Sequence, residues 1–405
     1  MHILYIHQYF CPPGGIGNNR SLELARLWVQ AGHKVTVLTS TAYFPAHLKG
    51  GDKQQDLEID GIHVVPLAVP YSHLMRFRER VKAFLQFYRK ARQIAKGLPK
   101  PDLIYASSTP PTVGELGRKL SRHWEIPFVF ETVDVWPDVP IGMGIVKNPV
   151  LKCWLNRRVN RIYREASLIV ALSDGMKEQI LTHGVDPQKV IVSYNGTSLK
   201  AFPFQAREAK PNLKIIYTGT VGLANGVEAI VDVCKLLESR GVSAVEFSVL
   251  GGGNDLARVK AHAANVDVKG LRFLDPVPKE QVADLLATAD IGVVTFAPFS
   301  VLQANSANKF YDYLASGLPV LLNYQGWQAE YLEQWNCGRA SKMGDLHAFA
   351  DNIEWLLQNP TARSEMGKNA RRLAESHFDR KKIAGDLLAG FQRILNSGHS
   401  TRAVE

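Results

Sequence analysis

Short apolar runs alternate with helix-length segments along the first half of this chain. The runs predicted to be strands are Ile3–Ile6, Val35–Leu38, His63–Pro66, Leu103–Ala106, Pro127–Phe130, Leu168–Ala171 and Val190–Val192. Several are continuously apolar, as is typical of parallel strands that helices cover on both faces. Strands and helices that alternate in this way predict a doubly wound α/β domain.

The pattern breaks between residues 194 and 212 into Asn-Gly, proline and mixed polar residues, and then starts again. The second set of expected strands is Ile215–Thr218, Phe247–Leu250, Arg272–Leu274, Ile291–Thr295 and Val320–Asn323, separated by helices near Gly226–Ser239, Asn254–Ala264, Lys279–Ala287 and Asn308–Ser316. A chain of 405 residues also exceeds the usual size of one hydrophobic core. We therefore predict an α/β fold with two Rossmann-like domains at 1–195 and 213–378, a linker at 196–212, and a C-terminal helix at 379–405 that could pack back on the first domain.

The composition, with 46% apolar and 21% charged residues, is that of an ordinary globular protein. No window approaches about 18 uninterrupted apolar residues, so no membrane-spanning helix is expected. The first residues lack the basic lead of a signal peptide and resemble a buried strand. The cysteines have no paired spacing, which predicts neither a zinc site nor a disulfide framework and favours a reducing cytosolic compartment: Cys11, Cys153, Cys234 and Cys337.

The net charge of +10 is concentrated in two segments. Arg76 to Lys100 contains nine Lys/Arg residues against one acid and is interleaved with aromatic residues, and Lys147 to Arg164 contains six Lys/Arg residues. Basic amphipathic helices of this kind favour an anionic membrane surface as partner, although a solvated helix face is the alternative. No nucleic-acid-binding signature accompanies the charge, so we expect no nucleic acid partner.

Glycine-rich turns follow three of the expected strands. Gly14, Gly15 and Gly17 follow the first strand, but Arg20 breaks the G-x-G-x-x-G pattern that a nicotinamide dinucleotide would require. Tyr217–Gly222 and Leu250–Asn254 each join a strand to a helix in the second half. Turns of this kind expose backbone N–H groups that bind phosphates without a metal, and no Asp-x-Asp cluster suggests manganese.

The segment from Ser306 to Val320 predicts a helix that begins after a Ser306 cap and ends at Gly317. Lys309 and Asp312 lie three apart and share a helix face. A cation beside a helix N-terminus suits a diphosphate, and a carboxylate one turn on can accept both hydroxyls of a ribose. The alternative is a surface ion pair between the two.

Acidic and aromatic residues follow the expected strand that ends at Phe130. Glu131 and Asp134 lie where this strand emerges, and a carboxylate there could accept a hydroxyl proton or stabilise positive charge at a sugar carbon. Trp136 offers a flat apolar face for a sugar ring. Alternatively, Trp136 belongs to the core and Asp134 caps the loop.

In these motifs and their order, the chain resembles the retaining glycosyltransferases of family 4, which have the GT-B fold, over nearly its full length. The matching segments are Gly14-Gly15, Ser173-Asp-Gly with Gly184-Val, Tyr194-Asn-Gly196, Tyr217-Thr-Gly219, Gly251-Gly-Gly253, Ala289-Asp-Ile-Gly and Lys309-Phe-Tyr-Asp-Tyr-Leu-Ala-Ser-Gly-Leu-Pro-Val. The opening His7-Gln-Tyr-Phe-Cys-Pro-Pro-Gly-Gly and the Asp134-Val-Trp-Pro segment are similar to the branch that builds bacterial O-antigen and capsule, which includes N-acetyl-L-fucosaminyltransferases.

The resemblance implies two Rossmann-like domains that face each other across a cleft. It implies retaining transfer of a sugar from a nucleoside diphosphate, with UDP the expected carrier, to a lipid-linked saccharide. No cofactor or metal is expected, and the enzyme would lie at the inner face of the plasma membrane. Asp312 would hold the ribose and Lys309 the diphosphate. The residues expected to bind the donor are Gly14, Gly15, Gly219, Thr220, Gly251, Gly252, Ser306, Asn308, Lys309 and Asp312, with Asp134 and Glu131 as catalytic candidates and Trp136 at the acceptor or sugar.

Three positions depart from the family pattern. The family pattern has two glutamates eight residues apart. In this chain Asp312 stands at the second of these positions and Ala304 at the first, so a less hydroxylated, deoxy or amino sugar is expected. Thr220 and Asn225 stand near positions where the family often has Arg and Lys, and Asp134 is nearest to a frequent histidine. Two other functions stay open: a sugar-nucleotide 2-epimerase, and a non-catalytic protein that binds sugar nucleotide or lipid.

Overall fold

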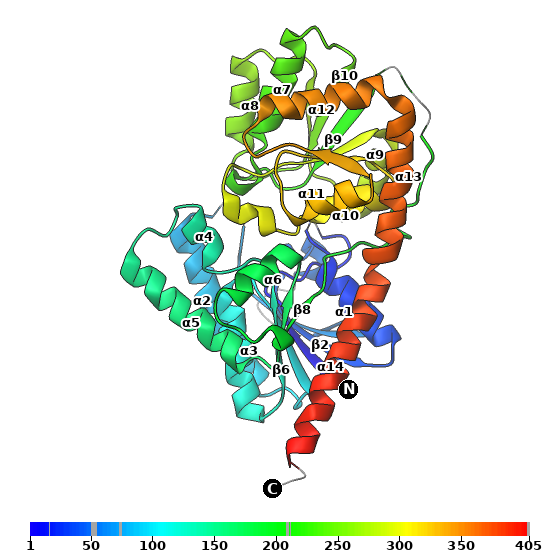
Figure 1. Ribbon diagram of the computed structural model, residues 1–405. Coiled ribbons are helices and arrows are strands. Elements are labelled where there is room, and N and C mark those ends of the chain that lie inside the picture. The colour runs from blue at the N-terminus through cyan, green and yellow to red at the C-terminus, as the bar shows by residue number, and fades with distance from the viewer. Residues whose placement is uncertain (16, 50–54, 73–74, 208–209, 211, 403–405) are drawn as a thin grey trace. The chain divides into compact units, whose positions relative to one another are not determined.

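The computed structural model divides the chain into two units (Figure 1). The first comprises Met1–Tyr194 with Arg380–Glu405, and the second comprises Asn195–Asp379. The structure describes residues 1–15, 17–49, 55–72, 75–207, 210 and 212–402. Parts of the expected linker and C-terminal segment, at 208–209, 211 and 403–405, lie outside the described residues, as does the side chain of Phe77 in the expected basic helix.

The first unit is built on an eight-stranded sheet of order β3-β4-β2-β1-β5-β6-β7-β8. The paired strands are parallel except β3, which runs antiparallel to β4. The strands are β1 His2–Ile6, β2 Lys34–Ser40, β3 Leu57–Ile59, β4 Ile62–Leu67, β5 Leu103–Ser107, β6 Phe128–Thr132, β7 Leu168–Ala171 and β8 Val190–Val192. The helices are α1 Arg20–Gln30, α2 Phe77–Ala95, α3 Pro111–Trp124, α4 Asp138–Gly142, α5 Pro149–Glu165, α6 Asp174–Leu181 and α14 Arg380–Arg402.

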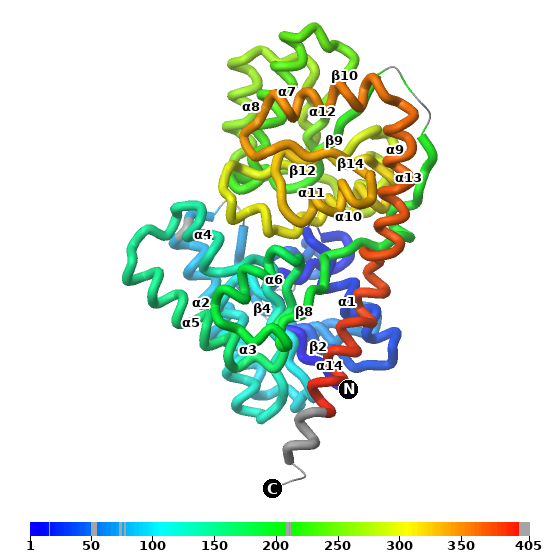
Figure 2. Tube along the Cα trace, viewed as in Figure 1, coloured from blue at the N-terminus to red at the C-terminus, as the bar shows by residue number. Residues whose placement is uncertain are grey.

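Helices cover both faces of this sheet, so its central strands β1, β5 and β6 are almost entirely buried. Helices α1 and α14 pack together on one face, and α2, α3 and α5 lie on the other. The buried indole of Trp28 donates to the Ala384 carbonyl at 3.2 Å and lies 5.3 Å from the Phe391 ring. The C-terminal helix α14 is therefore part of the core of the first unit, next to the strands of the chain's beginning (Figure 2).

The second unit has a six-stranded parallel sheet of order β11-β10-β9-β12-β13-β14. Its strands are β9 Leu213–Thr218, β10 Val245–Leu250, β11 Leu271–Leu274, β12 Ile291–Val294, β13 Val320–Leu322 and β14 Gly338–Ala340. Its helices are α7 Glu228–Ser239, α8 Leu256–Asn265, α9 Lys279–Thr288, α10 Asn308–Ala315, α11 Trp327–Gln334, α12 Leu346–Gln358 and α13 Pro360–His377.

The predicted fold class is confirmed, because both units are α/β domains whose sheets are parallel apart from the edge strand β3 and are covered by helices. The expected strands form, with ends that shift by one or two residues. The short strands β3 and β14 were not predicted from the sequence, because they are three residues each and lack a buried apolar run. No described helix is both long and apolar enough to cross a membrane.

Candidate active site

The glycine turns after β9 and β10 pack directly against each other through their backbones. The Gly219 N–H donates to the Leu250 carbonyl at 2.9 Å, and the Val221 N–H donates to the Gly252 carbonyl at 2.9 Å. Gly251 has a φ of +145°, and a Cβ at this position would overlap the Gly219 carbonyl oxygen. Glycine is therefore required at 251, because only bare backbone allows the two turns to approach so closely.

Lys309 points from α10 to the end of β9. Its Nζ lies 3.8 Å from the centre of the Tyr217 ring, and its Cε lies within 3.1 Å of the place that a Gly219 Cβ would occupy. The side chain is buried, and among the described residues it has no ion-pair partner. Burial lowers the pKa of Lys309 from 10.5 to about 7. The end of β9 thus holds a cation that lacks a counter-ion.

Asp312 is buried one turn along the same helix, and both carboxylate oxygens have partners. Its Oδ1 accepts from Thr197 Oγ1 at 2.8 Å, and its Oδ2 pairs with the Lys279 ammonium. The Lys279 Nζ also lies 5.0 Å from the Phe202 ring centre. The surface ion pair between Lys309 and Asp312 is therefore not formed: both side chains are buried, and the described ion pair of Asp312 is with Lys279.

Lys279 is the residue of this region that sequence reasoning missed. It begins α9, directly after the loop that follows β11, so the same rule that pointed to the other strand-to-helix turns could have indicated it.

We expect Lys279→Met to lower the free energy of unfolding of the second unit by about 1–3 kcal/mol, because the buried Asp312 carboxylate loses its cation. Chemical denaturation measures this change. The Lys279→Met/Asp312→Asn double variant should recover most of the loss, since it leaves no uncompensated charge. Equal losses in the single and double variants would contradict the pairing.

The beginning of α10 differs from the prediction that Ser306 caps the helix. Ala307 occupies the cap position without a side-chain hydrogen bond, and the Ser306 hydroxyl instead pairs with the Tyr311 hydroxyl at 2.6 Å. The cap prediction was wrong because Ser306 lies one residue too early and the Tyr311 hydroxyl, five residues further along, pairs with its hydroxyl. The first residue of the helix, Asn308, keeps a buried Oδ1 without a hydrogen-bond partner among the described residues. Thr220 is exposed in the turn after β9.

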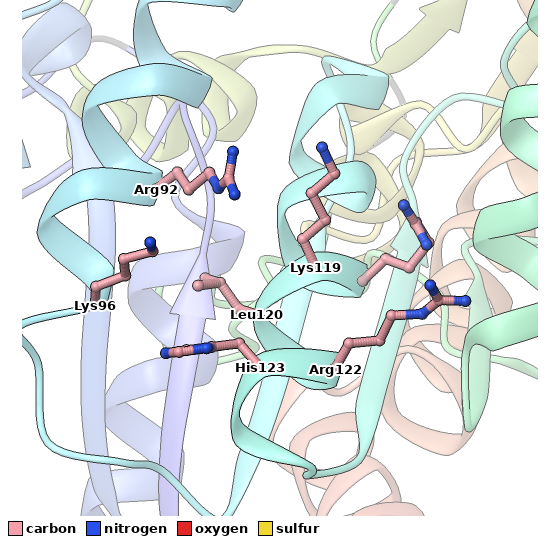
Figure 3. Close-up of a pocket in the computed structure, with 7 residues that line it drawn as sticks. Arg92, Lys96, Lys119, Leu120, Arg122 and His123 are labelled. Atoms are coloured by element: carbon pink, nitrogen blue, oxygen red, sulfur yellow. The ribbon is translucent and has the colours of Figure 1, made fainter.

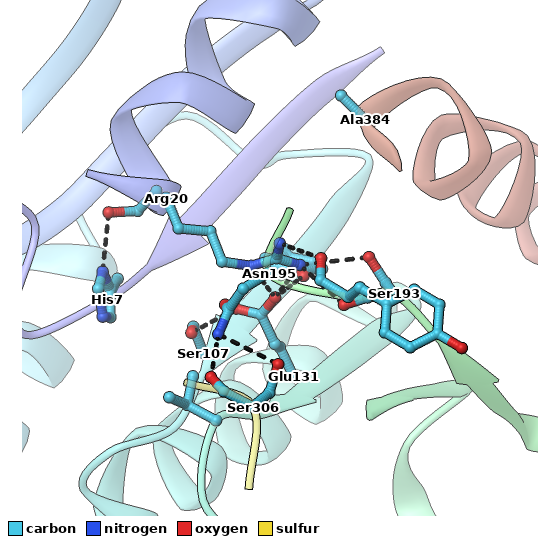
Figure 4. A network of polar contacts seen from close by, with 12 residues as sticks. His7, Arg20, Ser107, Glu131, Ser193, Asn195, Ser306 and Ala384 are labelled. Carbon is cyan, nitrogen blue, oxygen red and sulfur yellow. Dashed lines mark hydrogen bonds and ion pairs between the residues drawn. The ribbon is translucent and has the colours of Figure 1, made fainter. Parts of the chain in front are cut away.

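In the first unit, the side chain of Glu131 is completely buried at the end of β6 (Figure 4). Its Oε1 accepts from Arg20 Nε at 3.0 Å and from the Tyr105 hydroxyl at 2.7 Å, and its Oε2 accepts from Ser107 Oγ at 2.5 Å. Arg20 also donates to the Tyr194 carbonyl at 2.7 Å. Burial alone would raise the pKa of Glu131, but the Arg20 guanidinium and the two hydroxyls hold it below its usual range. Glu131 is thus an ionised group that anchors Arg20 at the start of α1.

Asp134 lies on the loop after β6 and has a different environment. Its Oδ2 accepts from Thr109 Oγ1 at 3.0 Å, and burial raises the pKa of its carboxyl. Trp136 is only half-buried, so its ring is not a core side chain. Of the two catalytic candidates, Asp134 is the one with a raised pKa, a property common in groups that handle protons.

The turn after β1 is shaped by close packing against the loop after β2. A Cβ on Gly15 would lie 2.6 Å from the Tyr43 carbonyl oxygen, so a side chain there would displace the turn. Gly14, with a φ of +75°, is exposed and has free space around it.

Across the described residues, no group of three or more His, Cys, Asp or Glu side chains could hold a metal ion.

Two family models match adjoining parts of the chain. The model of the glycosyl transferase 4-like domain matches residues 14–196, and the model of glycosyl transferases group 1 matches residues 200–373. The first part of the chain belongs to the glycosyl transferase 4-like domain family, and the second part to the glycosyl transferases group 1 family. The finer assignment to a fucosaminyltransferase branch is not part of what these models match.

The chain is 23% identical over 246 residues to an uncharacterized glycosyltransferase of Methanocaldococcus jannaschii, covering 58% of this chain and 60% of that protein. It is 21% identical over 361 residues to the capsular polysaccharide biosynthesis glycosyltransferase CapM of Staphylococcus aureus, covering 85% and 87%. Among solved structures, the Anabaena protein HepE in complex with UDP-glucose has a TM-score of 0.70 at 15% identity, covering 97% of this chain and 100% of that one. The chain spans about three-fifths of the length of the first of these relatives.

Proposed function

We propose that this protein transfers a sugar from a UDP-sugar to a lipid-linked saccharide in the synthesis of a bacterial surface polysaccharide, with retention of the anomeric configuration and without a metal. The observation that carries the proposal is Lys309, a buried cation without a counter-ion beside the glycine turn after β9. A diphosphate would supply the missing negative charge. The capsule-synthesis relative and the UDP-glucose bound to HepE support this substrate class.

The ribose would share the Asp312 carboxylate with Thr197 and Lys279. Two carboxylate oxygens offer about four acceptor sites, and the described partners occupy two of them. At the sugar, the buried Ala304 offers no carboxylate, so we propose a donor with fewer hydroxyls, such as an N-acetylated deoxy sugar. In the transfer, the acceptor hydroxyl would form the new bond to the anomeric carbon as the bond to the diphosphate breaks, and its proton would pass to the departing diphosphate. Asp134 would stabilise the positive charge that develops on the sugar.

Calorimetry of the intact protein with UDP, followed by incubation with UDP-sugars and a lipid-linked acceptor extract, tests the proposal. Saturable UDP binding and an extended saccharide whose new linkage retains the donor configuration are expected. Absence of any uridine nucleotide binding would refute it. Release of a free epimer without an acceptor would instead indicate an epimerase.

Asp134→Asn should reduce the turnover rate by about a hundredfold or more, since it removes the charge beside the sugar, while UDP affinity stays within about twofold of the wild type. Steady-state kinetics and calorimetry separate the two effects. In the matched variant Thr109→Val, the carboxyl loses the hydrogen bond that lowers its pKa. The acidic limb of the pH–rate profile should therefore move to higher pH; an unchanged limb would exclude Asp134 as the titrating group.

The lipid-linked acceptor implies contact with a membrane, and the surface of the first unit supports such contact. Every exposed large hydrophobic residue described in this unit lies on α2 or in the segment 145–154, which contains the start of α5: Val81, Leu85, Ile94, Ile145, Val150, Leu151 and Trp154. Val150 is 76% exposed, and Trp154 is 50% exposed beneath the Arg158 guanidinium. Apolar side chains among cations are typical of surfaces that enter anionic headgroup layers.

We expect Val150→Glu to reduce co-sedimentation with phosphatidylglycerol vesicles severalfold, because it places a negative charge in an apolar contact with an anionic surface. Leu223→Glu, at a 57% exposed position of the second unit, is the matched control and should bind vesicles as the wild type does. Charge reversal at Arg78, Lys82 and Arg89 should also release the protein. Unchanged binding in all variants would mean that these helices are merely solvated.

A further inference from the structure

A cavity of about 250 Å³ lies between α2 and α3 in the first unit (Figure 3). Its lining is almost entirely basic: Arg92, Lys96, Arg118, Lys119, Leu120, Arg122 and His123. We propose that this cavity is a binding site for a phosphate-bearing anion. The proposal is independent of the transferase activity, because none of these residues belongs to the candidate active site.

The cavity combines a rigid basic wall with free cations. Arg118 is buried and paired with Glu115 at 2.8 Å and Glu165 at 2.9 Å, and Arg122 pairs with Glu165 at 2.7 Å. These ion pairs hold the α3 side in place, so a ligand would not have to order it. Arg92 and Lys96 extend from α2 toward α3. Within the described part of the chain, neither has a hydrogen-bond or ion-pair partner.

The formal charges of the lining residues and their ion-pair partners sum to a positive value. The two carboxylates of Glu115 and Glu165 offset two of the three α3 cations, so one charge remains on that side, and Arg92 and Lys96 add two more across the gap. Like charges that face each other without counter-ions repel, and a multivalent anion between them removes this repulsion. Arg and Lys are also the side chains that bind phosphate oxygens most strongly.

The place of the cavity in the first unit separates it from the catalytic candidates of that unit. Arg92 and Lys96 precede the loop that leads into the beginning of β5, and Arg122 and His123 precede the beginning of β6. The cavity therefore lies at the edge where strands begin, whereas Glu131 and Asp134 lie where β6 ends. Its volume is below that of typical pockets for drug-sized molecules, which favours a phosphate or diphosphate group over a whole sugar nucleotide.

Calorimetry with sodium pyrophosphate on the full chain tests the site. The wild type should show saturable binding, and Arg92→Gln/Lys96→Gln should weaken it by about tenfold or more, since two charge-assisted contacts are lost. The control Lys82→Gln/Arg89→Gln removes two exposed cations of the same helix outside the cavity and should change affinity by less than about twofold. The Lys309→Ala variant lacks the cation proposed to bind the donor diphosphate, and it should retain the part of the pyrophosphate binding that depends on Arg92 and Lys96.

The phosphate could belong to a lipid headgroup or to a soluble molecule, and vesicles distinguish these sources. If it is a headgroup, the Arg92/Lys96 pair of substitutions should weaken phosphatidylglycerol vesicle binding more than the control pair, and pyrophosphate should compete. If the phosphate belongs to a soluble molecule, the two pairs of substitutions should affect vesicle binding equally, and only the Arg92/Lys96 substitutions should weaken pyrophosphate binding. The proposal is overturned if the wild type shows no saturable pyrophosphate binding or if the Arg92/Lys96 and Lys82/Arg89 substitutions weaken that binding equally. It is also overturned if Lys309→Ala alone abolishes the binding. If the wild type does not bind pyrophosphate and the Arg92→Gln/Lys96→Gln variant has a lower melting temperature, these cations only complement the carboxyl ends of the helices.

Discussion

Lys309→Met should weaken UDP binding by about a hundredfold and at the same time raise the free energy of unfolding. The ammonium is the buried cation at the end of β9, so its loss removes charge-assisted contacts to the diphosphate. Without a bound nucleotide the same ammonium is a buried charge that has no counter-ion among the described residues, which is unfavourable. Methionine keeps a flexible apolar side chain against the Tyr217 ring and does not carry that cost.

The gain in stability should depend on pH in a defined direction. The pKa of Lys309 is lowered by burial from 10.5 to about 7, so between these values the unfolded chain binds a proton that the folded protein does not. The stability of the wild type therefore rises with pH across this window relative to that of the variant. The advantage of Lys309→Met should be largest below pH 7 and should vanish near pH 10.5. Thermal unfolding of both proteins over this range measures it.

Nucleotide binding supplies an independent readout of the same group. At pH 8 to 9 the Lys309 amine of the empty site is mostly neutral, and a bound diphosphate should restore its proton. Calorimetry of UDP binding in buffers of different ionisation enthalpy should reveal uptake approaching one proton in the wild type and none in Lys309→Met. Wild-type affinity in the variant, or binding without proton uptake, would contradict the role given to Lys309.

Arg20→Met should lower the free energy of unfolding of the first unit by about 3–5 kcal/mol, because the fully buried Glu131 carboxylate would lose its counter-ion. The Tyr105 and Ser107 hydroxyls would remain and cannot compensate a whole charge. Denaturant unfolding, followed through the transition of the first unit, measures the loss. The double variant Arg20→Met/Glu131→Leu should recover much of it, since the buried charge is gone.

The pH dependence and a conservative variant separate the structural role of Glu131 from a chemical one. The pKa of Glu131 is lowered, so its ionisation contributes stability above its ordinary value of 4.5 and that contribution is lost as the pH falls. Glu131→Gln keeps the shape while removing the charge and should destabilise the fold in the same direction as Arg20→Met. If Glu131→Gln instead leaves stability unchanged and reduces turnover, the carboxylate acts on the substrate and the anchoring role of Glu131 is wrong.

Several of the strands that were predicted correctly from the sequence share one physical property. They are apolar runs buried on both faces, such as β7 and β12, so their signal lies in consecutive residues. The strands that were missed, β3 and β14, are three residues each, and neither contains a buried apolar run. The cap at Ser306 failed for another reason, because the Ser306 hydroxyl pairs with the Tyr311 hydroxyl five residues further along, a side-chain contact that cap rules do not include.

The sequence by itself determined the two α/β units, the glycine turns at strand ends and the presence of Lys309 and Asp312 on one short helix, because periodicity and turn chemistry are local properties. Only the tertiary structure decided what these side chains face. Asp312 pairs with Lys279, 33 residues away in the sequence, and Glu131 pairs with Arg20, 111 residues away. Among the described residues, Lys309 has no counter-ion. Charges acquire their partners and their pKa shifts when distant segments pack and exclude water, and no window of neighbouring residues contains that information.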